Sequence, residues 1–217
     1  MTDKSQLPKP QRPRLKSVIL ASASPRRQTL LRQLNISFVV DPSNINEEAI
    51  PLSEPEEYAK TLAFRKAEAV SKRHRNALII GADTIVVQNN TILGKPVDEG
   101  EAFTMLRTLS NSRHEVITGL CLLTTDMNHR AEKTETIAVT TRVHFDTLTD
   151  QEIRDYISTG SPFDKAGGYG IQDDQGALFV KGIEGDFYNV VGFPINSFYR
   201  LLKSSFQEFL PFKVTSH

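Results

Sequence analysis

The chain opens with an apolar run that changes abruptly into a helical pattern. Residues 18–21 are apolar and numerous enough for a buried strand. After a short polar break, leucines recur at the spacing of one helix face, at Leu30, Leu31 and Leu34. Ser24 suits a helix N-cap, and Pro25 suits the first helical position, where its missing N–H costs nothing. This segment therefore predicts a strand, a tight loop and a helix.

A second helical pattern begins near residue 53 and runs to about residue 74, after a short predicted strand at 38–40. Ser53 and Glu56 have the spacing of an S-x-x-E capping box, which predicts the helix start. One face of this helix is apolar: Tyr58, Ala59, Leu62, Ala63, Ala69 and Val70. Lys66 falls near the centre of that face. A lysine there either extends its ammonium to the surface or meets an anion, and the pattern leaves both open.

Residues 77–87 are largely apolar and predict a buried strand pair or one bent strand. Asp83 lies inside this stretch. Such a carboxylate needs a cationic partner or a metal, because leaving it unpaired costs on the order of several kcal/mol. A turn aspartate between two short strands is the alternative. Asn89 and Asn90 then predict a hairpin turn, which returns Lys95 toward the region of Asp83.

Two long strands and three helices complete the pattern. The strands are expected at about 114–125 and 134–147, the second with clear apolar and polar alternation. Asp98 predicts one helix start, and a capping box predicts another at Thr149 and Glu152. A last amphipathic helix is expected at 195–209, packed on the sheet. Strands and helices mixed in this way predict an α/β fold.

The segment 161–172 is unusual because it contains three glycines in four residues. Asp164 and Lys165 precede these glycines, separated from them by Ala166. Glycine-rich backbone either approaches another group closely or forms a flexible surface loop. The sequence does not choose between these two interpretations.

Arg26 and Arg27 break a local rule at the start of the first helix. They lie beside unpaired backbone N–H groups at the positive end of the helix dipole, where each cation costs roughly 0.3–1 kcal/mol. An anion bound there would meet the N–H groups and two guanidinium groups together. The alternative is a helix that begins with two solvated arginines.

Composition narrows the classes of partner. The 217 residues have 39% hydrophobic and 24% charged residues, which is an ordinary globular composition. Because 26 basic residues balance 26 acidic ones, no overall field attracts nucleic acid or an anionic membrane. The single Cys121 fits a core position in a reducing compartment, so we expect a cytoplasmic protein without membrane spans. The polar residues 1–16 and 211–217 are expected to be tails around one globular domain at 17–210.

Several of these exceptions share one chemistry. Four cations stand where the local pattern prefers other residues: Arg26, Arg27, Lys66 and Lys95. Asp83 and Glu47 are carboxylates at the ends of apolar segments. This set suits a polyphosphate with a hard divalent ion such as Mg²⁺, with Mn²⁺ or Co²⁺ as substitutes. No G-x-x-x-x-G-K-[ST] loop is present, which argues against a P-loop nucleotidase.

Five ordered motifs also resemble the Maf family of nucleotide pyrophosphatases. They are SASPRR, EPEEYAKTLAFRKA, GADT, GKP and DKAGGYGIQ, and the match runs over residues 17–203. The resemblance implies an α/β fold with a long mixed twisted sheet flanked by helices, two lobes and a central cleft, related to the inosine-triphosphate pyrophosphatases. It also implies metal-dependent hydrolysis of a nucleoside triphosphate to the monophosphate and pyrophosphate, and a homodimer.

The same resemblance implies a role for individual residues. Ser22, Arg26 and Arg27 match the family's phosphate-binding residues, and Asp83 matches its proton acceptor. The remaining catalytic positions correspond to Glu47, Lys66 and Lys95, with Asp83 and Glu47 as metal ligands. One departure is that Asn44 and Asn46 stand where members often have aspartates, which puts any further carboxylate ligand from that loop in doubt.

Base selection is implied by three more matches. Arg26, Thr84 and Gln172 resemble the subgroup that acts on dTTP and UTP, and the chain lacks the tryptophan that is typical of the 7-methyl-GTP subgroup. The amide of Gln172 can match the N3–H and O4 edge of thymine or uracil. Two alternatives stay open: a nucleotide-sensing regulatory protein with incidental turnover, and an enzyme that acts on modified triphosphates.

Overall fold

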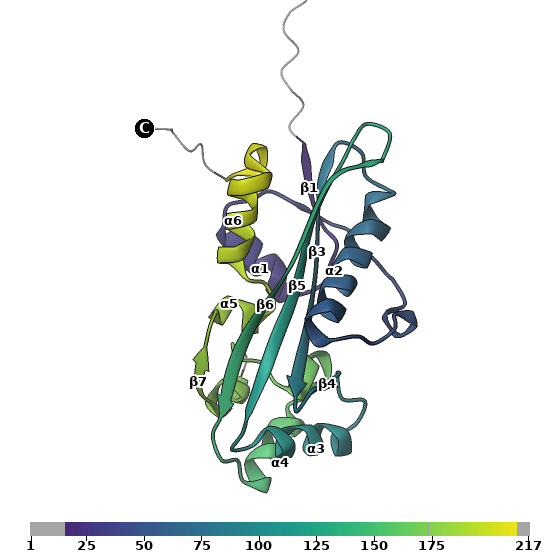
Figure 1. Cartoon of the computed structure of the whole chain (residues 1–217). Coiled ribbons are helices and arrows are strands. Elements are labelled where there is room, and N and C mark those ends of the chain that lie inside the picture. Colours follow the sequence, from purple (N-terminus) through teal and green to yellow (C-terminus); the bar gives the residue numbers. More distant parts are fainter. Residues whose placement is uncertain (1–15, 173, 212–217) are drawn as a thin grey trace, which may run out of the picture.

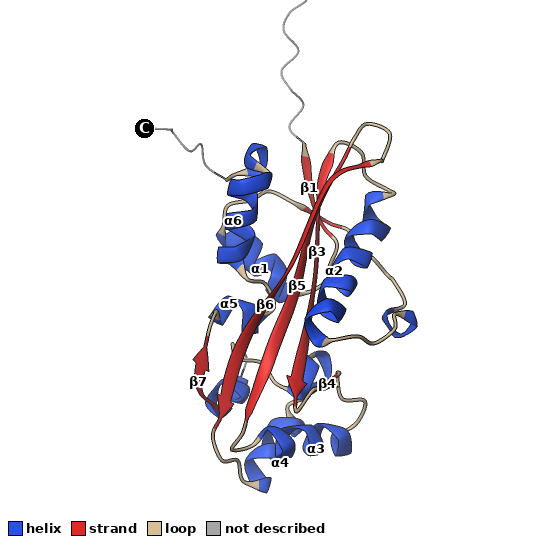
Figure 2. Cartoon of the chain, viewed as in Figure 1, coloured by secondary structure: helices blue, strands red, loops and turns tan. Residues whose placement is uncertain are grey.

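Three long antiparallel strands form the centre of one mixed sheet in this computed structural model, which describes residues 16–172 and 174–211 (Figures 1 and 2). The strand order is β2-β1-β3-β5-β6-β7, with β4 paired to β3. Only β1 pairs in parallel, with both β2 and β3. The strands are β1 (Ser17–Leu20), β2 (Val39–Val40), β3 (Ala77–Gln88), β4 (Thr91–Leu93), β5 (Arg113–Thr125), β6 (Ala131–Phe145) and β7 (Val180–Glu184).

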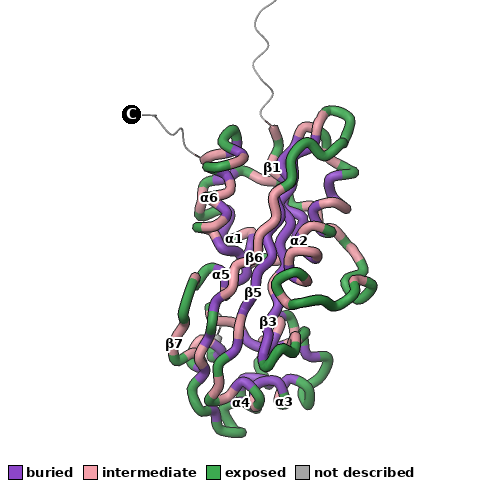
Figure 3. The backbone as a smooth tube through the Cα atoms, viewed as in Figure 1, coloured by how far each residue is buried: buried purple, intermediate pink, exposed green. Residues whose placement is uncertain are grey.

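Helices cover both faces of this sheet and its far end. Figure 2 shows α1, α5 and α6 along one face, α2 along the other, and α3 and α4 beyond the end of the long strands. Buried apolar side chains fill the layers between, and the tube in Figure 3 is buried along most of β3 and β5. The helices are α1 (Pro25–Gln33), α2 (Pro55–Ser71), α3 (Glu99–Leu109), α4 (Asp150–Ser158), α5 (Phe187–Val191) and α6 (Ile195–Ser205).

The predicted α/β class with a long mixed sheet flanked by helices is confirmed. The relation to the inosine-triphosphate pyrophosphatases stays a prediction. Nearly all of the two expected tails, residues 1–15 and 212–217, lies outside the described residues. No helix within 16–172 and 174–211 combines the length and apolar character that crossing a bilayer requires.

The helix starts follow the sequence rules at three of four positions. The side chains of Ser24, Asp98 and Thr149 cap α1, α3 and α4 as predicted. The capping box predicted at Ser53 is wrong, because Glu54 is the N-cap of α2 and makes no side-chain cap. The reason lies in the next residue: Pro55 favours the first helical position and holds the residue before it in an extended conformation.

The apolar segment after α2 is one continuous strand, β3, rather than a strand pair. Strand β5 pairs with it from Leu78 to Val87 without interruption. Asp83 therefore lies in the middle of a strand, and the alternative of a turn aspartate is wrong. Neighbouring side chains of β3 point to opposite faces of the sheet.

Helix α2 lies unusually close to the sheet because two glycines face it. A Cβ atom added to Gly119 would lie 2.0 Å from the carbonyl oxygen of Ala59, and one added to Gly81 would lie 2.1 Å from that of Ala63. The helix backbone thus contacts the strands directly, and both of these helix positions carry only a methyl group. This close packing brings the inward face of α2, with Lys66, onto β3.

We expect Gly119→Ala to destabilise the protein by roughly 1–3 kcal/mol, because the added methyl group overlaps the backbone of α2. Each kcal/mol should lower the midpoint of thermal unfolding by about 2–4 °C in a chain of this size. Gly182→Ala in β7 is the matched control, since an added Cβ there meets no atom within 4 Å. Equal melting temperatures for the two variants would contradict this close contact.

A gap beside β3 determines where the cleft opens. Strand β1 pairs with β3 only as far as Ile80, and β4 pairs with it only from Val86 onward. Between these points, residues 81–85 have no strand neighbour on that edge among the residues that the structure describes. Asp83 and Thr84 project to opposite faces, and both reach the open space at this gap.

Candidate active site

A cleft of about 710 Å³ lies beside the gap in the sheet. Its volume falls within the range that small-molecule sites occupy. Its walls come from the loop before α1, the segment around Glu47, α2, β3, the chain after β4, the loop 164–172 and the end of α5. All nine residues predicted for the site line this cleft: Ser22, Arg26, Arg27, Glu47, Lys66, Asp83, Thr84, Lys95 and Gln172.

Lys66 joins the two carboxylates of the site. Its ammonium nitrogen Nζ lies 2.5 Å from Asp83 Oδ1 and 2.8 Å from a carboxylate oxygen of Glu47. The lysine is only 8% exposed, and Asp83 is equally buried. Of the two interpretations of Lys66, the one in which its ammonium contacts an anionic group is therefore confirmed. The second oxygen of Asp83, Oδ2, accepts no hydrogen bond from the described residues and is available to another group.

Tyr58 also lines this part of the cleft. Burial raises the pKa of its hydroxyl, and the negative charges of Asp83 and Glu47 raise it further, while Lys66 opposes them. The hydroxyl thus stays protonated and can donate a hydrogen bond. The sequence pattern placed Tyr58 in the apolar stripe of α2, so its position in the cleft was missed.

Arg27 points inward and holds three cleft groups together. Its Nη1 donates to Ser22 Oγ at 3.0 Å, its Nη2 donates to Thr84 Oγ1 at 3.0 Å, and its Nε donates to the carbonyl oxygen of Gly192 at 2.9 Å. Burial lowers the pKa of Arg27, and the neighbouring Arg26 adds to this effect, but an arginine remains cationic at neutral pH. Arg27 therefore organises the cleft in addition to lending it charge.

Arg26 faces the loop on the other side of the cleft. Its Nη1 lies 3.2 Å from Asp164 Oδ2, and the other oxygen of Asp164 accepts a hydrogen bond of 2.7 Å from Lys165 Nζ. Although burial acts to raise the pKa of Asp164, the hydrogen bonds and charges of Lys165 and Arg26 lower it. The sequence singled out these two loop residues without giving them a role. The structure places both in the cleft wall.

The glycine-rich loop is held close to its neighbours, which decides between its two interpretations. Gly167 has a left-handed φ of 69° and packs on Val86, and its N–H donates to the carbonyl oxygen of Gly94 at 2.9 Å. Tyr169 is anchored by a 2.7 Å hydrogen bond between its hydroxyl and His114 Nε2. These contacts fix the loop against the strand edge.

Lys95 enters the cleft from the chain after β4, and Gln172 enters it from the end of this loop. Neither side chain forms an ion pair or hydrogen bond with another residue in the described ranges. The predicted return of Lys95 brings it to the same cleft as Asp83, without a contact between the two. Both side chains are free to meet a ligand.

The two carboxylates fit a divalent metal only together with further ligands from substrate and water. Asp83 and Glu47 supply oxygen ligands, which hard cations prefer. Within the described residues, no group of three or more Asp, Glu, His or Cys side chains could hold a metal by itself. Mg²⁺ is commonly bound by one or two carboxylates with substrate phosphates and water, and this donor set matches that arrangement.

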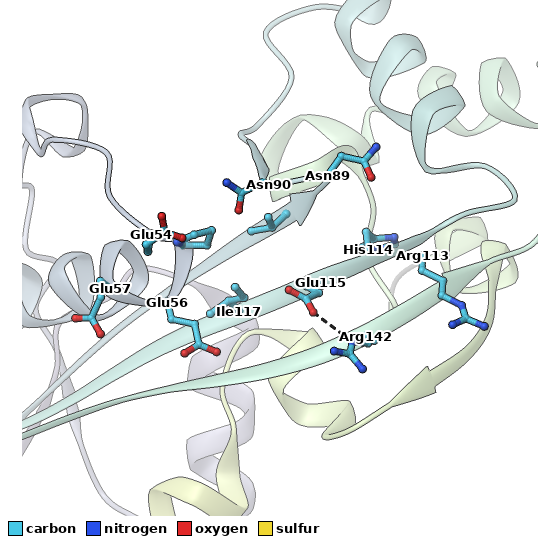
Figure 4. Close-up of a pocket in the computed structure, with 12 residues that line it drawn as sticks. Glu54, Glu56, Glu57, Asn89, Asn90, Arg113, His114, Glu115, Ile117 and Arg142 are labelled. Atoms are coloured by element: carbon cyan, nitrogen blue, oxygen red, sulfur yellow. Dashed lines mark hydrogen bonds and ion pairs between the residues drawn. The ribbon is translucent and has the colours of Figure 1, made fainter.

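A second hollow, of about 690 Å³, lies on the α2 side of the sheet near the β3–β4 turn (Figure 4). Glu54, Glu56 and Glu57 line it at the start of α2, and its Arg142 is paired with Glu115. Acidic groups thus outnumber basic ones in this hollow. In the first cleft, five cationic side chains face three carboxylates, so only the first suits a polyanion.

Comparison with known proteins identifies relatives of this chain. Residues 17–205 match the family model described as Maf-like protein. A dTTP/UTP pyrophosphatase of Halalkalibacterium halodurans is 50% identical over 189 residues, which cover 87% of this chain and 96% of that protein. Another from Geobacillus sp. is 47% identical over 190 residues, covering 87% and 98%. A third, from Salinibacter ruber, is 44% identical over 193 residues, covering 89% and 93%.

Proposed function

The chain belongs to the Maf-like protein family, and from this premise we propose that it hydrolyses dTTP and UTP to the nucleoside monophosphate and pyrophosphate. The observation that carries the proposal is the convergence of Arg26, Lys66, Lys95 and Asp83 on one cleft. It is supported by relatives of 44–50% identity that are named dTTP/UTP pyrophosphatases. The cytoplasmic location and the homodimer stay predictions.

In the proposed reaction, water attacks the α-phosphorus and Asp83 accepts its proton. The available oxygen Oδ2 of Asp83 is the accepting atom, while Lys66 orients the carboxylate through Oδ1. A bond forms between the water oxygen and the α-phosphorus, and the bond from this phosphorus to the bridging oxygen breaks. Pyrophosphate leaves with that oxygen. General-base assistance of this kind contributes about 10²–10⁴-fold to the rate.

The cations stabilise the charge that builds on the departing pyrophosphate. Arg26 and Lys95 both line the cleft, and Ser22 adds a hydroxyl beside the start of α1. Positioning and electrostatic stabilisation carry most of the catalysis in phosphoryl transfer. Arg27 fixes the positions of Ser22 and Thr84 and adds its charge.

We also propose a divalent metal, with Mg²⁺ as the first candidate and Mn²⁺ or Co²⁺ as substitutes. Asp83 and Glu47 would hold it together with substrate phosphate oxygens. When bound, the metal would supply charge neutralisation at the phosphates. Glu47 is well suited to a second contact because its side chain is 51% exposed.

A panel of triphosphates tests the proposal. We expect dTTP and UTP to yield pyrophosphate and monophosphate with many turnovers, and we expect a chelator to abolish the reaction. The assay should measure released pyrophosphate separately from orthophosphate across common and modified nucleotides. Orthophosphate as the main product would contradict cleavage at the α-phosphorus. Stoichiometric binding without turnover would favour a nucleotide-sensing protein instead.

A further inference from the structure

A chain of buried hydroxyl groups leads from Thr84 into the interior of the sheet. Thr118 on β5 is directly opposite Thr84 in the strand register and is fully buried. The two hydroxyl oxygens lie 2.9 Å apart. Thr118 Oγ1 lies 3.2 Å from the backbone carbonyl oxygen of Asn189, at the start of the turn that ends at Gly192. The sequence pattern gave no role to Thr118 or to this turn.

The donors and acceptors along this chain determine where each proton lies. A carbonyl oxygen can only accept, so the single proton of Thr118 is donated to Asn189. Thr118 must then accept the proton of Thr84. Arg27 carries only donors, so Thr84 also accepts from its Nη2 at 3.0 Å. One lone pair of Thr84 Oγ1 is left, and this half-buried residue lines the cleft.

A second arrangement of the protons also keeps the Thr84 proton inside the protein, but it leaves no free lone pair on Thr84. Its hydroxyl could donate to the carbonyl oxygen of Gly192, 3.4 Å away, while Thr118 donated back to it. The first arrangement is favoured because the contact of Thr118 with Asn189, at 3.2 Å, is shorter than that of Thr84 with Gly192. In both arrangements the proton of Thr84 stays within the protein. Thr84 never offers a donor to the cleft.

Selecting one base over another requires a group that is fixed either as a hydrogen-bond donor or as an acceptor, and Gln172 does not provide one. Its amide has an acceptor and a donor side, and no hydrogen bond with the described part of the chain fixes which side faces the cleft. Turned one way it matches the N3–H and O4 of uracil. Turned the other way it matches the N3 acceptor and the amino group of cytosine equally well. Gln172 alone therefore does not separate these bases.

We propose that Thr118 is a positioning residue that fixes Thr84 as a pure hydrogen-bond acceptor toward the nucleobase. Uracil and thymine offer Thr84 a donor at N3, whereas cytosine offers an acceptor and leaves two lone pairs opposed. A site built around such a hydrogen bond rejects the mismatched base strongly. This inference rests on the proposed hydrolysis of dTTP and UTP and explains how that site excludes CTP.

The test is the ratio of kcat/KM for UTP to that for CTP in Thr118→Val. Valine keeps the shape and removes the acceptor of the Thr84 proton, so Thr84 becomes able to donate to cytosine. We expect the ratio to fall at least tenfold, mainly through faster hydrolysis of CTP. Thr118→Ser, which keeps the hydroxyl, should retain the wild-type ratio. Thr124→Val is the matched control, a buried threonine on the same strand that lies outside the cleft.

The outcomes separate this inference from the proposed function. If the wild-type protein releases no pyrophosphate from either nucleotide, the proposed function fails. If it hydrolyses UTP and CTP equally well, or if folded Thr118→Val keeps the wild-type ratio, the role of Thr118 is overturned while the activity stands. Circular dichroism should confirm folding. Should the valine variant not fold, Thr118→Ala removes the same hydroxyl without added bulk, and the same ratio decides.

Discussion

Asp83→Asn should lower kcat for dTTP and UTP at least about a hundredfold while the nucleotide still binds. The asparagine oxygen can still accept the hydrogen bond from Lys66, so the cleft keeps its shape. The change removes the basic oxygen that would take the proton from water. Lys66 retains Glu47, 2.8 Å away, as a charged partner. Turnover should be measured by pyrophosphate release and affinity by calorimetry under conditions without turnover.

A surface carboxylate provides the control for this substitution. Asp155→Asn changes an exposed residue of α4 outside the cleft and should leave kcat at the wild-type value. Near-normal turnover of Asp83→Asn would remove Asp83 from the role of general base. Loss of nucleotide binding in the same variant would instead assign it to substrate or metal binding.

The sequence predicted most of this site because its residues break local rules. Lys66 on an apolar helix face and Asp83 in an apolar strand are costly alone, so each indicates a partner. The structure pairs the two at 2.5 Å. Their contact depends on Gly81 and Gly119, which let α2 approach the sheet. That approach is a matter of tertiary packing, and no local sequence pattern predicts it.

Other features of the cleft depend on strand pairing. Thr84 reaches the same cleft as Asp83 only because β1 ends and β4 begins on either side of it. Alternation along the strand predicts that Asp83 and Thr84 lie on opposite faces of the sheet, so the sequence alone does not bring them to one site. Thr118 carries a signal similar to that of Asp83, a polar residue in an apolar strand. A threonine fits a buried strand so readily that its signal is weak.

The second large effect concerns the lysine itself. Lys66→Met should destabilise the protein by about 3 kcal/mol, because it leaves the buried Asp83 charge without its partner. The midpoint of thermal unfolding should then fall by roughly 6–12 °C. Activity should fall as well, since the carboxylate of Asp83 loses the contact that orients it. Arg65→Met is the matched control: its ion pair with Glu68 is exposed and contributes at most about 1 kcal/mol.

A double-mutant cycle measures how strongly Lys66 and Asp83 interact. In Lys66→Met combined with Asp83→Asn, no buried charge is left unpaired at this contact, so much of the lost stability should return. The double variant should therefore melt above Lys66→Met alone, while remaining inactive. Stability losses that simply add would mean that Lys66 and Asp83 act independently. In that case the hydrogen bond between them would not be what holds the carboxylate of Asp83 in place.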